Sequence, residues 1–230
     1  ARFIHWAQNP PDGHRAPGGA CMRGVGGLAK NITSWRTTGG QTGGGCGAVM
    51  RSHPYALRFP ASLEKAVRIA VDHGRMTHRD PISDAAVAAQ VAGVWLAVHR
   101  WVPKTKIADA MIKFADRYSR PTAEMLAWTL TEQKRTVVMD RMRGWAAHEA
   151  VCAGLWCFMN TDNVKDSLRA GADTPGDSDS IASLAGALTG GYLGEEELPE
   201  DWVQILERVG KLEALARATV SRSPGRMEDM

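Results

Sequence analysis

The stretch over residues 80–99 constrains the fold more than any other part of the sequence. Asp80 stands directly before Pro81, which places an N-capping acid ahead of a proline at the first helical position. Residues 85–99 are then largely apolar and rich in Ala and Val. This composition predicts one long helix that is buried at the centre of the protein.

Apolar residues recur at helical spacing through the rest of the chain from Ala61 onward, separated by proline or glycine. No segment shows the alternation expected of a strand, so the sequence predicts an all-α fold. We expect a single domain over residues 1–220 and a flexible tail over residues 221–230. Besides the stretch at 85–99, helices are expected at residues 62–72, 104–118, 122–133, 145–158, 164–170, 179–193 and 201–218, the last with a break near Gly210.

The first fifty residues differ from the rest because glycine and proline are frequent there. Both residue types are typical of turns, so we expect loops in this region, with one short helix over residues 20–28.

The charge balance and the cysteines narrow the functional classes. The chain has 28 Lys and Arg against 25 Asp and Glu, without a long basic block, which does not favour a dedicated nucleic-acid binder. There is no apolar run long enough to span a membrane and no signal-peptide pattern, so we expect a cytoplasmic protein without membrane contact. The four cysteines match no zinc or redox spacing and are expected to be free thiols.

The strongest chemical signal lies at residues 173–180, where three carboxylates stand directly ahead of an apolar helix. Asp177, Asp179 and Ser180 offer the oxygen ligands that a hard divalent cation such as magnesium prefers. The alternative is helix N-capping, because Asp and Ser also favour the positive end of a helix dipole. Carboxylates at the end of a buried helix lose solvation and need a cation or several donors, which favours the metal site.

A glycine-rich loop at residues 42–51 is a second candidate site. Its exposed backbone N–H groups can bind phosphate, and Arg51 can add a positive charge. The spacing matches neither the Walker A nor the dinucleotide-binding pattern, so a plain flexible loop is the alternative.

Two single side chains are weaker candidates. His78 lies just before a helix start and can bond a ribose or phosphate oxygen, although a lone histidine is usually structural. Trp145 follows Gly144 and can stack on an aromatic base, although core packing is the alternative for any one of eight tryptophans.

Taken in this order, the segments resemble the ADP-ribosylglycohydrolase family, whose members remove ADP-ribose from modified side chains. The resemblance spans nearly the whole chain and implies a compact, multi-helix orthogonal bundle. The matching stretches are residues 15–22, 45–51 followed by Pro54, 77–78, 144–150 and 176–182, with Gly186, Gly194, Pro199 and Trp202.

The resemblance also implies a site. One or two magnesium ions would be bound by Asp177, Asp179 and Ser180, and the two carboxylates would also act in catalysis. His78 would approach the ribose and phosphates, and Trp145 would flank the adenine. The diphosphate and distal ribose would lie on the loop formed by Gly44, Gly45, Cys46 and Gly47, with Gly18 in the same cleft.

The resemblance is incomplete at the start of the chain. The family's Thr-Asp-Asp metal ligands align before Ala1, so we expect the remaining ligands from a preceding part of the protein. The expected substrate is an ADP-ribosylated protein or small molecule, with a nucleic-acid acceptor left open, and ADP-ribose is the expected product. The alternatives are a non-catalytic relative that binds ADP-ribose or a nucleotide, and a plain helical interaction module.

Overall fold

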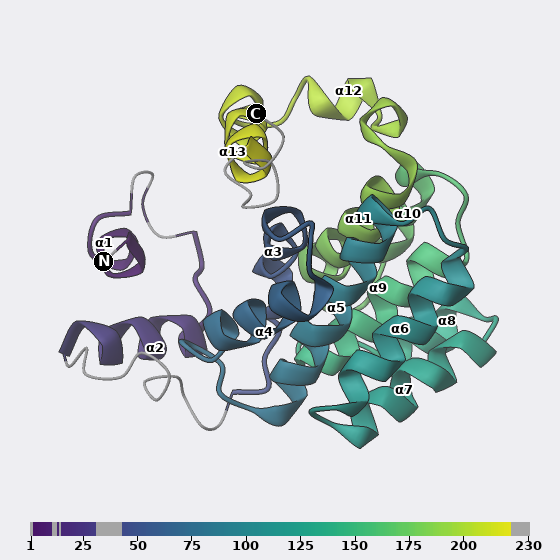
Figure 1. Cartoon of the computed structure of the whole chain (residues 1–230), viewed down its shortest axis with the longest axis horizontal. Coiled ribbons are helices and arrows are strands. Elements are labelled where there is room, and N and C mark those ends of the chain that lie inside the picture. The colour runs from purple at the N-terminus through teal and green to yellow at the C-terminus, as the bar shows by residue number, and fades with distance from the viewer. Residues whose placement is uncertain (1, 11–12, 14, 31–42, 222–230) are drawn as a thin grey trace.

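The computed structural model describes residues 2–10, 13, 15–30 and 43–221. These residues form thirteen α-helices and two short 3-10 helices and no strand, which confirms the all-α prediction (Figure 1). The α-helices are α1 (Arg2–Gln8), α2 (Gly19–Lys30), α3 (Pro54–Arg58), α4 (Leu63–Gly74), α5 (Pro81–His99), α6 (Lys104–Asp116), α7 (Arg120–Thr131), α8 (Arg135–Arg141), α9 (Ala147–Met159), α10 (Val164–Ala172), α11 (Ser178–Leu193), α12 (Glu200–Val203) and α13 (Val209–Ser221), and the 3-10 helices are η1 (Val49–Arg51) and η2 (Glu195–Glu197).

Helix α5 lies at the centre of the bundle, as its composition predicts. Asp80 caps its start, because the Oδ1 atom accepts a hydrogen bond from the backbone N–H of Ile82 at 2.8 Å. The helix packs against α4, α6, α9 and α11. It is long and apolar enough to cross a membrane, but 78% of its apolar window is buried inside the protein, as in a core helix.

Small residues fix α11, the helix that follows the acidic segment, against its neighbours. A Cβ atom added at Gly154 of α9 would lie 3.0 Å from the Cβ of Leu184. A Cβ added at Gly171 of α10 would lie 2.9 Å from the Cα of Ala182. These close approaches set the position of α11, and hence of the carboxylates at its N-terminus.

The structure corrects several sequence expectations. The first fifty residues hold α1 in addition to the expected short helix, and α3 and α8 were not predicted, because five and seven residues are too few for a clear apolar period. Gly210 lies inside α13 and does not break it. The break covers residues 204–208 and ends at Arg208, whose φ of 60° is left-handed and whose carbonyl accepts from the N–H of Leu212.

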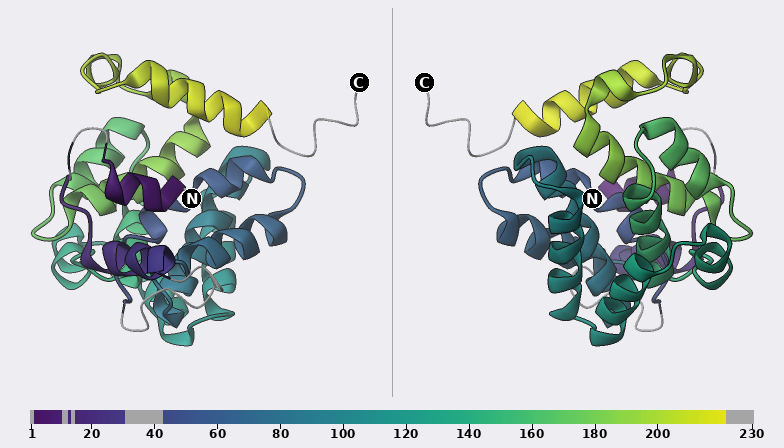
Figure 2. Two further views of the ribbon diagram at one scale, coloured as in Figure 1. Left: turned by 90° about the vertical axis from the view of Figure 1, so that its left-hand side faces the viewer. Right: turned by 90° about the vertical axis from the view of Figure 1, so that its right-hand side faces the viewer.

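Helix α13 lies on the outside of the bundle, where it contacts α3. Figure 2 shows α13 at the outer edge of the molecule, and none of its residues is buried. Ser221, the first residue of the expected tail, is the last residue of α13, and residues 222–230 lie outside the described part. The expected single domain over residues 1–220 stays a prediction.

Candidate functional site

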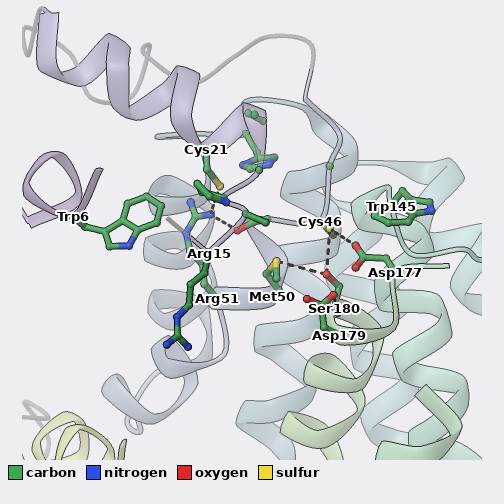
Figure 3. A pocket seen from close by; sticks show the side chains of 18 of the residues that line it. Trp6, Arg15, Cys21, Cys46, Met50, Arg51, Trp145, Asp177, Asp179 and Ser180 are labelled. Atoms are coloured by element: carbon green, nitrogen blue, oxygen red, sulfur yellow. Dashed lines mark hydrogen bonds between the residues drawn. The ribbon is translucent and has the colours of Figure 1, made fainter. Parts of the chain in front are cut away.

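A cavity of about 860 Å³ lies between the N-terminal helices and the start of α11 (Figure 3). Its volume falls within the roughly 300–1,000 Å³ typical of small-ligand sites. Ten of the eleven residues that the sequence offered for the site line it, although they come from segments far apart in the sequence. These residues are Gly18, Gly45, Cys46, Gly47, Arg51, His78, Trp145, Asp177, Asp179 and Ser180.

Gly44 is the predicted site residue that does not line the cavity. Its carbonyl accepts a hydrogen bond from the N–H of Ala147, at 2.7 Å, at the start of α9. The N–H of Cys46 donates to the carbonyl of Trp145 at 3.2 Å. This short bridge ties the described part of the glycine loop to α9, so Gly44 positions the loop from behind the cavity wall.

Asp177 directly precedes α11 and is only 8% exposed. Its side chain makes no N-capping bond, and its Oδ2 atom instead accepts a hydrogen bond from the Cys46 thiol at 3.0 Å. Burial and hydrogen bonding with Asp179 raise the pKa of Asp177. The same hydrogen bonding lowers the pKa of Asp179. The two carboxyl groups therefore form a close pair, and capping does not account for Asp177.

Gly176 and Gly144 allow the backbone ahead of α11 to approach the backbone ahead of α9 unusually closely. A Cβ atom at Gly176 would lie 2.0 Å from the carbonyl oxygen of Arg143, and the N–H of Asp177 donates to that same oxygen at 2.7 Å. Gly144 has a φ of 84°, and a Cβ there would lie 2.8 Å from Ile181. The segment ahead of α9 thus holds the segment ahead of α11 in place.

The donors at this end of the cavity fit a hard divalent cation. Two carboxylates and the Ser180 hydroxyl offer three oxygen ligands, half of an octahedral shell, and magnesium commonly keeps water in the remaining positions. The hydroxyl of Ser180 donates to the sulfur atoms of Cys46 at 3.4 Å and Met50 at 3.7 Å, which are weak acceptors. No group of three or more His, Cys, Asp or Glu side chains suited to a metal occurs among the described residues.

The Cys46 thiol is held at the centre of this arrangement. Burial, together with its hydrogen bond to Asp177, raises the pKa of Cys46 to about 12, so the thiol stays protonated at neutral pH. Its role here is that of a hydrogen-bond donor, and it is not an activated nucleophile.

His78 is buried beneath the glycine loop. Burial and the nearby charge of Arg51 lower the pKa of His78 to about 4, so its ring is neutral at physiological pH. Its Nδ1 atom lies 2.9 Å from the hydroxyl oxygen of Thr77. A Cβ atom at Gly47 would lie 3.0 Å from the ring, so the imidazole also supports the loop that it underlies.

Trp145 lies at the cavity edge, just outside α9. Its side chain is 64% exposed, so core packing does not explain this tryptophan. The sequence had suggested that it opens the helix, but the helix begins at Ala147.

Apart from Gly18, the N-terminal wall of the cavity was not predicted from the sequence. Phe3 and Trp6 of α1 line it, together with Arg15 and Cys21. The available signal was the three-residue spacing of Phe3 and Trp6, which places two aromatic rings on the same side of a helical turn.

Comparisons with known proteins point to one family. The model of the ADP-ribosylglycohydrolase family matches residues 1–228. ADP-ribosylarginine hydrolase Tri1 of Pseudomonas putida is 24% identical over 208 residues, which cover 90% of this chain and 54% of that protein. ADP-ribosyl-[dinitrogen reductase] glycohydrolase of Rhodospirillum rubrum is 27% identical over 195 residues, with coverages of 83% and 60%. The chain therefore spans little more than half of the length of these two relatives.

Two further matches are shorter or concern the fold alone. ADP-ribosylhydrolase ARH3 of Bos taurus is 30% identical over 96 residues, which cover 37% of this chain and 26% of that protein. A solved structure described as an ADP-ribosylglycohydrolase-related protein complex superposes with a TM-score of 0.81 at 23% identity. This superposition covers 96% of this chain and 72% of the other, and at that identity it establishes a shared fold.

Proposed function

Because the chain belongs to the ADP-ribosylglycohydrolase family, we propose that it hydrolyses the bond between ADP-ribose and an ADP-ribosylated acceptor. The cavity carries this proposal, because it combines a carboxylate pair with a glycine loop in one space. ADP-ribose presents ribose hydroxyls and a diphosphate. Carboxylates can accept from the hydroxyls, and backbone N–H groups can donate to the phosphates.

Magnesium, as one or two ions, is the proposed cofactor. Asp177, Asp179 and Ser180 would hold it, and it would polarise ligand oxygens and orient the sugar for attack by water. The three side chains lie at one end of the cavity, and their oxygen chemistry supports this assignment.

The protein groups have separate proposed tasks. Asp179 is more accessible than Asp177 and would orient the attacking water by accepting its hydrogen bond. Asp177 is held by the Cys46 thiol and would fix the geometry of the pair. Neutral His78 would support the loop of Gly45 and Gly47 against the diphosphate without adding charge.

The proposed acceptor is an arginine side chain of a protein. Support comes from the name of the Tri1 relative, whose alignment covers 90% of this chain. Hydrolysis of an N-glycosidic bond follows from that choice, and the cytoplasmic location expected from the sequence remains a prediction.

The test is release of ADP-ribose from an ADP-ribosylated arginine protein, with magnesium and with a chelator. We expect magnesium-dependent release that falls at least a hundredfold in Asp177→Asn and Asp179→Asn, roughly the cost of removing a transition-state contact. Asp173→Asn is the matched control, because Asp173 lies on the same segment but is exposed and paired with Arg135. Full activity in both site variants would refute the proposed roles, and no release by the intact protein would refute hydrolysis.

A second candidate function is ADP-ribose binding without turnover. The observation that favours it is the small number of metal-ligating side chains in the described part of the chain. Calorimetry would then show ADP-ribose binding by a protein that releases no product from the same substrate.

A further inference from the structure

A groove of about 910 Å³ lies along the C-terminal helices and shares no described lining residue with the cavity of the candidate site. It is formed by residues 195–221, and α13 contributes one side of it. Leu206 and Leu212 in its lining are 53% and 54% exposed, so apolar side chains here face solvent. The large apolar side chains of the lining are Leu198, Val203, Leu206, Val209, Leu212 and Val220.

Helix α13 lacks the packing that a helix of its length needs. It has 13 residues, and none of them is buried. Isolated helices of about this length are only marginally stable in water, and in proteins most of their stability comes from packing of an apolar face. Val209, Leu212, Ala216 and Val220 follow one another at three- and four-residue steps and line the groove, so they form one apolar stripe. This stripe is a face that a binding partner would cover.

The charges around the groove are mostly acidic. Residues 195–213 contain seven acids and two bases. Glu195, Glu200 and Glu213 line the groove, and none of the three forms an ion pair with a described residue. An apolar stripe beside unpaired carboxylates is complementary to a helix that carries its own apolar stripe with lysine or arginine next to it.

We propose that this groove binds a basic amphipathic helix of a partner protein. At 1.5 Å per residue α13 is about 20 Å long, which matches about three to four turns of a bound helix. Aliphatic side chains of the partner at i, i+3, i+4 and i+7 would pack on the apolar stripe, as in other complexes that place a helix in a groove. Its basic side chains would pair with Glu195, Glu200 and Glu213.

A second copy of the chain is a poorer occupant of the groove. Residues 195–221 contain seven acids and three bases, so two copies meeting at this face would bring like charges together. A partner with an excess of bases removes that repulsion. The proposal involves none of the residues that line the candidate site, so it does not depend on the proposed hydrolysis.

The test is binding of two fluorescent synthetic peptides to the full chain, measured by anisotropy. Both peptides are amphipathic, about four helical turns long, with leucine at i, i+3, i+4 and i+7; one carries lysine and the other glutamate at the remaining positions. We expect the lysine peptide to bind the wild type at least tenfold more tightly than the glutamate peptide, with an affinity that falls as salt is added. Glu213→Lys should weaken the lysine peptide and reduce its salt dependence.

Leu212→Ser and Leu215→Ser form the matched pair of variants. Leu215 lies on the same helix and is 56% exposed, close to the 54% of Leu212, but it does not line the groove. We expect Leu212→Ser to weaken the lysine peptide about tenfold, the effect of losing one well-packed contact, and Leu215→Ser to bind it like the wild type.

Three results would overturn the proposal. The first is equal affinity of the lysine peptide for Leu212→Ser and the wild type, and the second is an equal loss in Leu212→Ser and Leu215→Ser. The third is a wild-type dimer in sedimentation that Leu212→Ser dissociates, because the groove would then be occupied by a second copy.

Discussion

The two walls of the cavity are built on different physical principles. The wall with Asp177 directly precedes α11, whose Ile181, Leu184 and Leu188 side chains are buried, and its backbone is held against the carbonyl of Arg143. The wall with Trp6 belongs to α1, a seven-residue helix with no buried residue, held by contacts between surface rings. The carboxylates, whose proposed chemistry needs fixed distances, thus lie on the more rigid wall, and α1 forms a more loosely packed wall opposite them.

The largest effect on stability is expected from Gly176→Ala, because Gly176 lies in the wall that contains Asp177, next to the Arg143 backbone. The added Cβ would lie 2.0 Å from the carbonyl oxygen of Arg143, so the backbone must shift. We expect the free energy of unfolding to fall by about 3 kcal/mol, as in severe overpacking, measured by urea denaturation.

Gly190→Ala is the control for that substitution. Nothing lies within 4 Å of a Cβ at Gly190, which is inside α11, so this change should be neutral or stabilising by up to about 1 kcal/mol. Equal stability of the two variants would show that the approach of Arg143 does not hold the acid pair in place.

The same difference between the walls decides what the sequence could predict. Helix α5 has a capping acid, a proline and a long apolar run, so its position and burial followed from local rules. The acidic segment was recognisable because two carboxylates and a hydroxyl fall within residues 177–180, directly ahead of an apolar stretch. Both features are properties of neighbouring residues, and the structure confirms the helices that they predicted.

What the sequence could not provide was long-range placement. The contact between Cys46 and Asp177 joins residues 131 positions apart, and no local pattern encodes it. Gly44 was expected to face the ligand, but its neighbour in space is Ala147, which the sequence places a hundred residues away. Helix α1 was not predicted because it has only seven residues and none of them is buried. A helix this short depends on tertiary contacts for its stability, and a local sequence pattern does not show those contacts.

A smaller effect is expected from Phe3→Ala, which loosens the second wall. The change removes the ring that contacts Trp6, His73 and the guanidinium of Arg51. We expect α1 to lose about 1 kcal/mol of local stability, the scale of one such contact. Hydrogen exchange should show faster exchange over residues 2–8 with unchanged protection in α5.

Gln8→Ala is the control, because Gln8 lies on the same helix and is exposed. It should leave the exchange of α1 unchanged, apart from a slight gain in helix propensity. Loss of protection in α5 on Phe3→Ala would contradict the comparison, because the two walls would then unfold together.

The smallest effect on stability is expected from Asp177→Asn without divalent cations. The folded-state pKa of Asp177 is raised above the value of about 3.9 for an unfolded Asp, so its stabilising contribution is complete below that pH. The contribution is lost as the pH rises through the folded-state pKa. The wild type should therefore lose stability relative to Asp177→Asn, whose amide stays neutral, as the pH rises above about 4.

Urea unfolding at several pH values, with chelator and with magnesium, measures this difference. Magnesium should stabilise the wild type at neutral pH and have little effect on Asp177→Asn, since a cation offsets the repulsion within the carboxylate pair. Asp173→Asn should follow the wild type throughout, because Asp173 is exposed and outside the cavity. Parallel profiles for the wild type and Asp177→Asn would mean that the pair bears no electrostatic strain, and the case for a cation at the rigid wall would lose its physical basis.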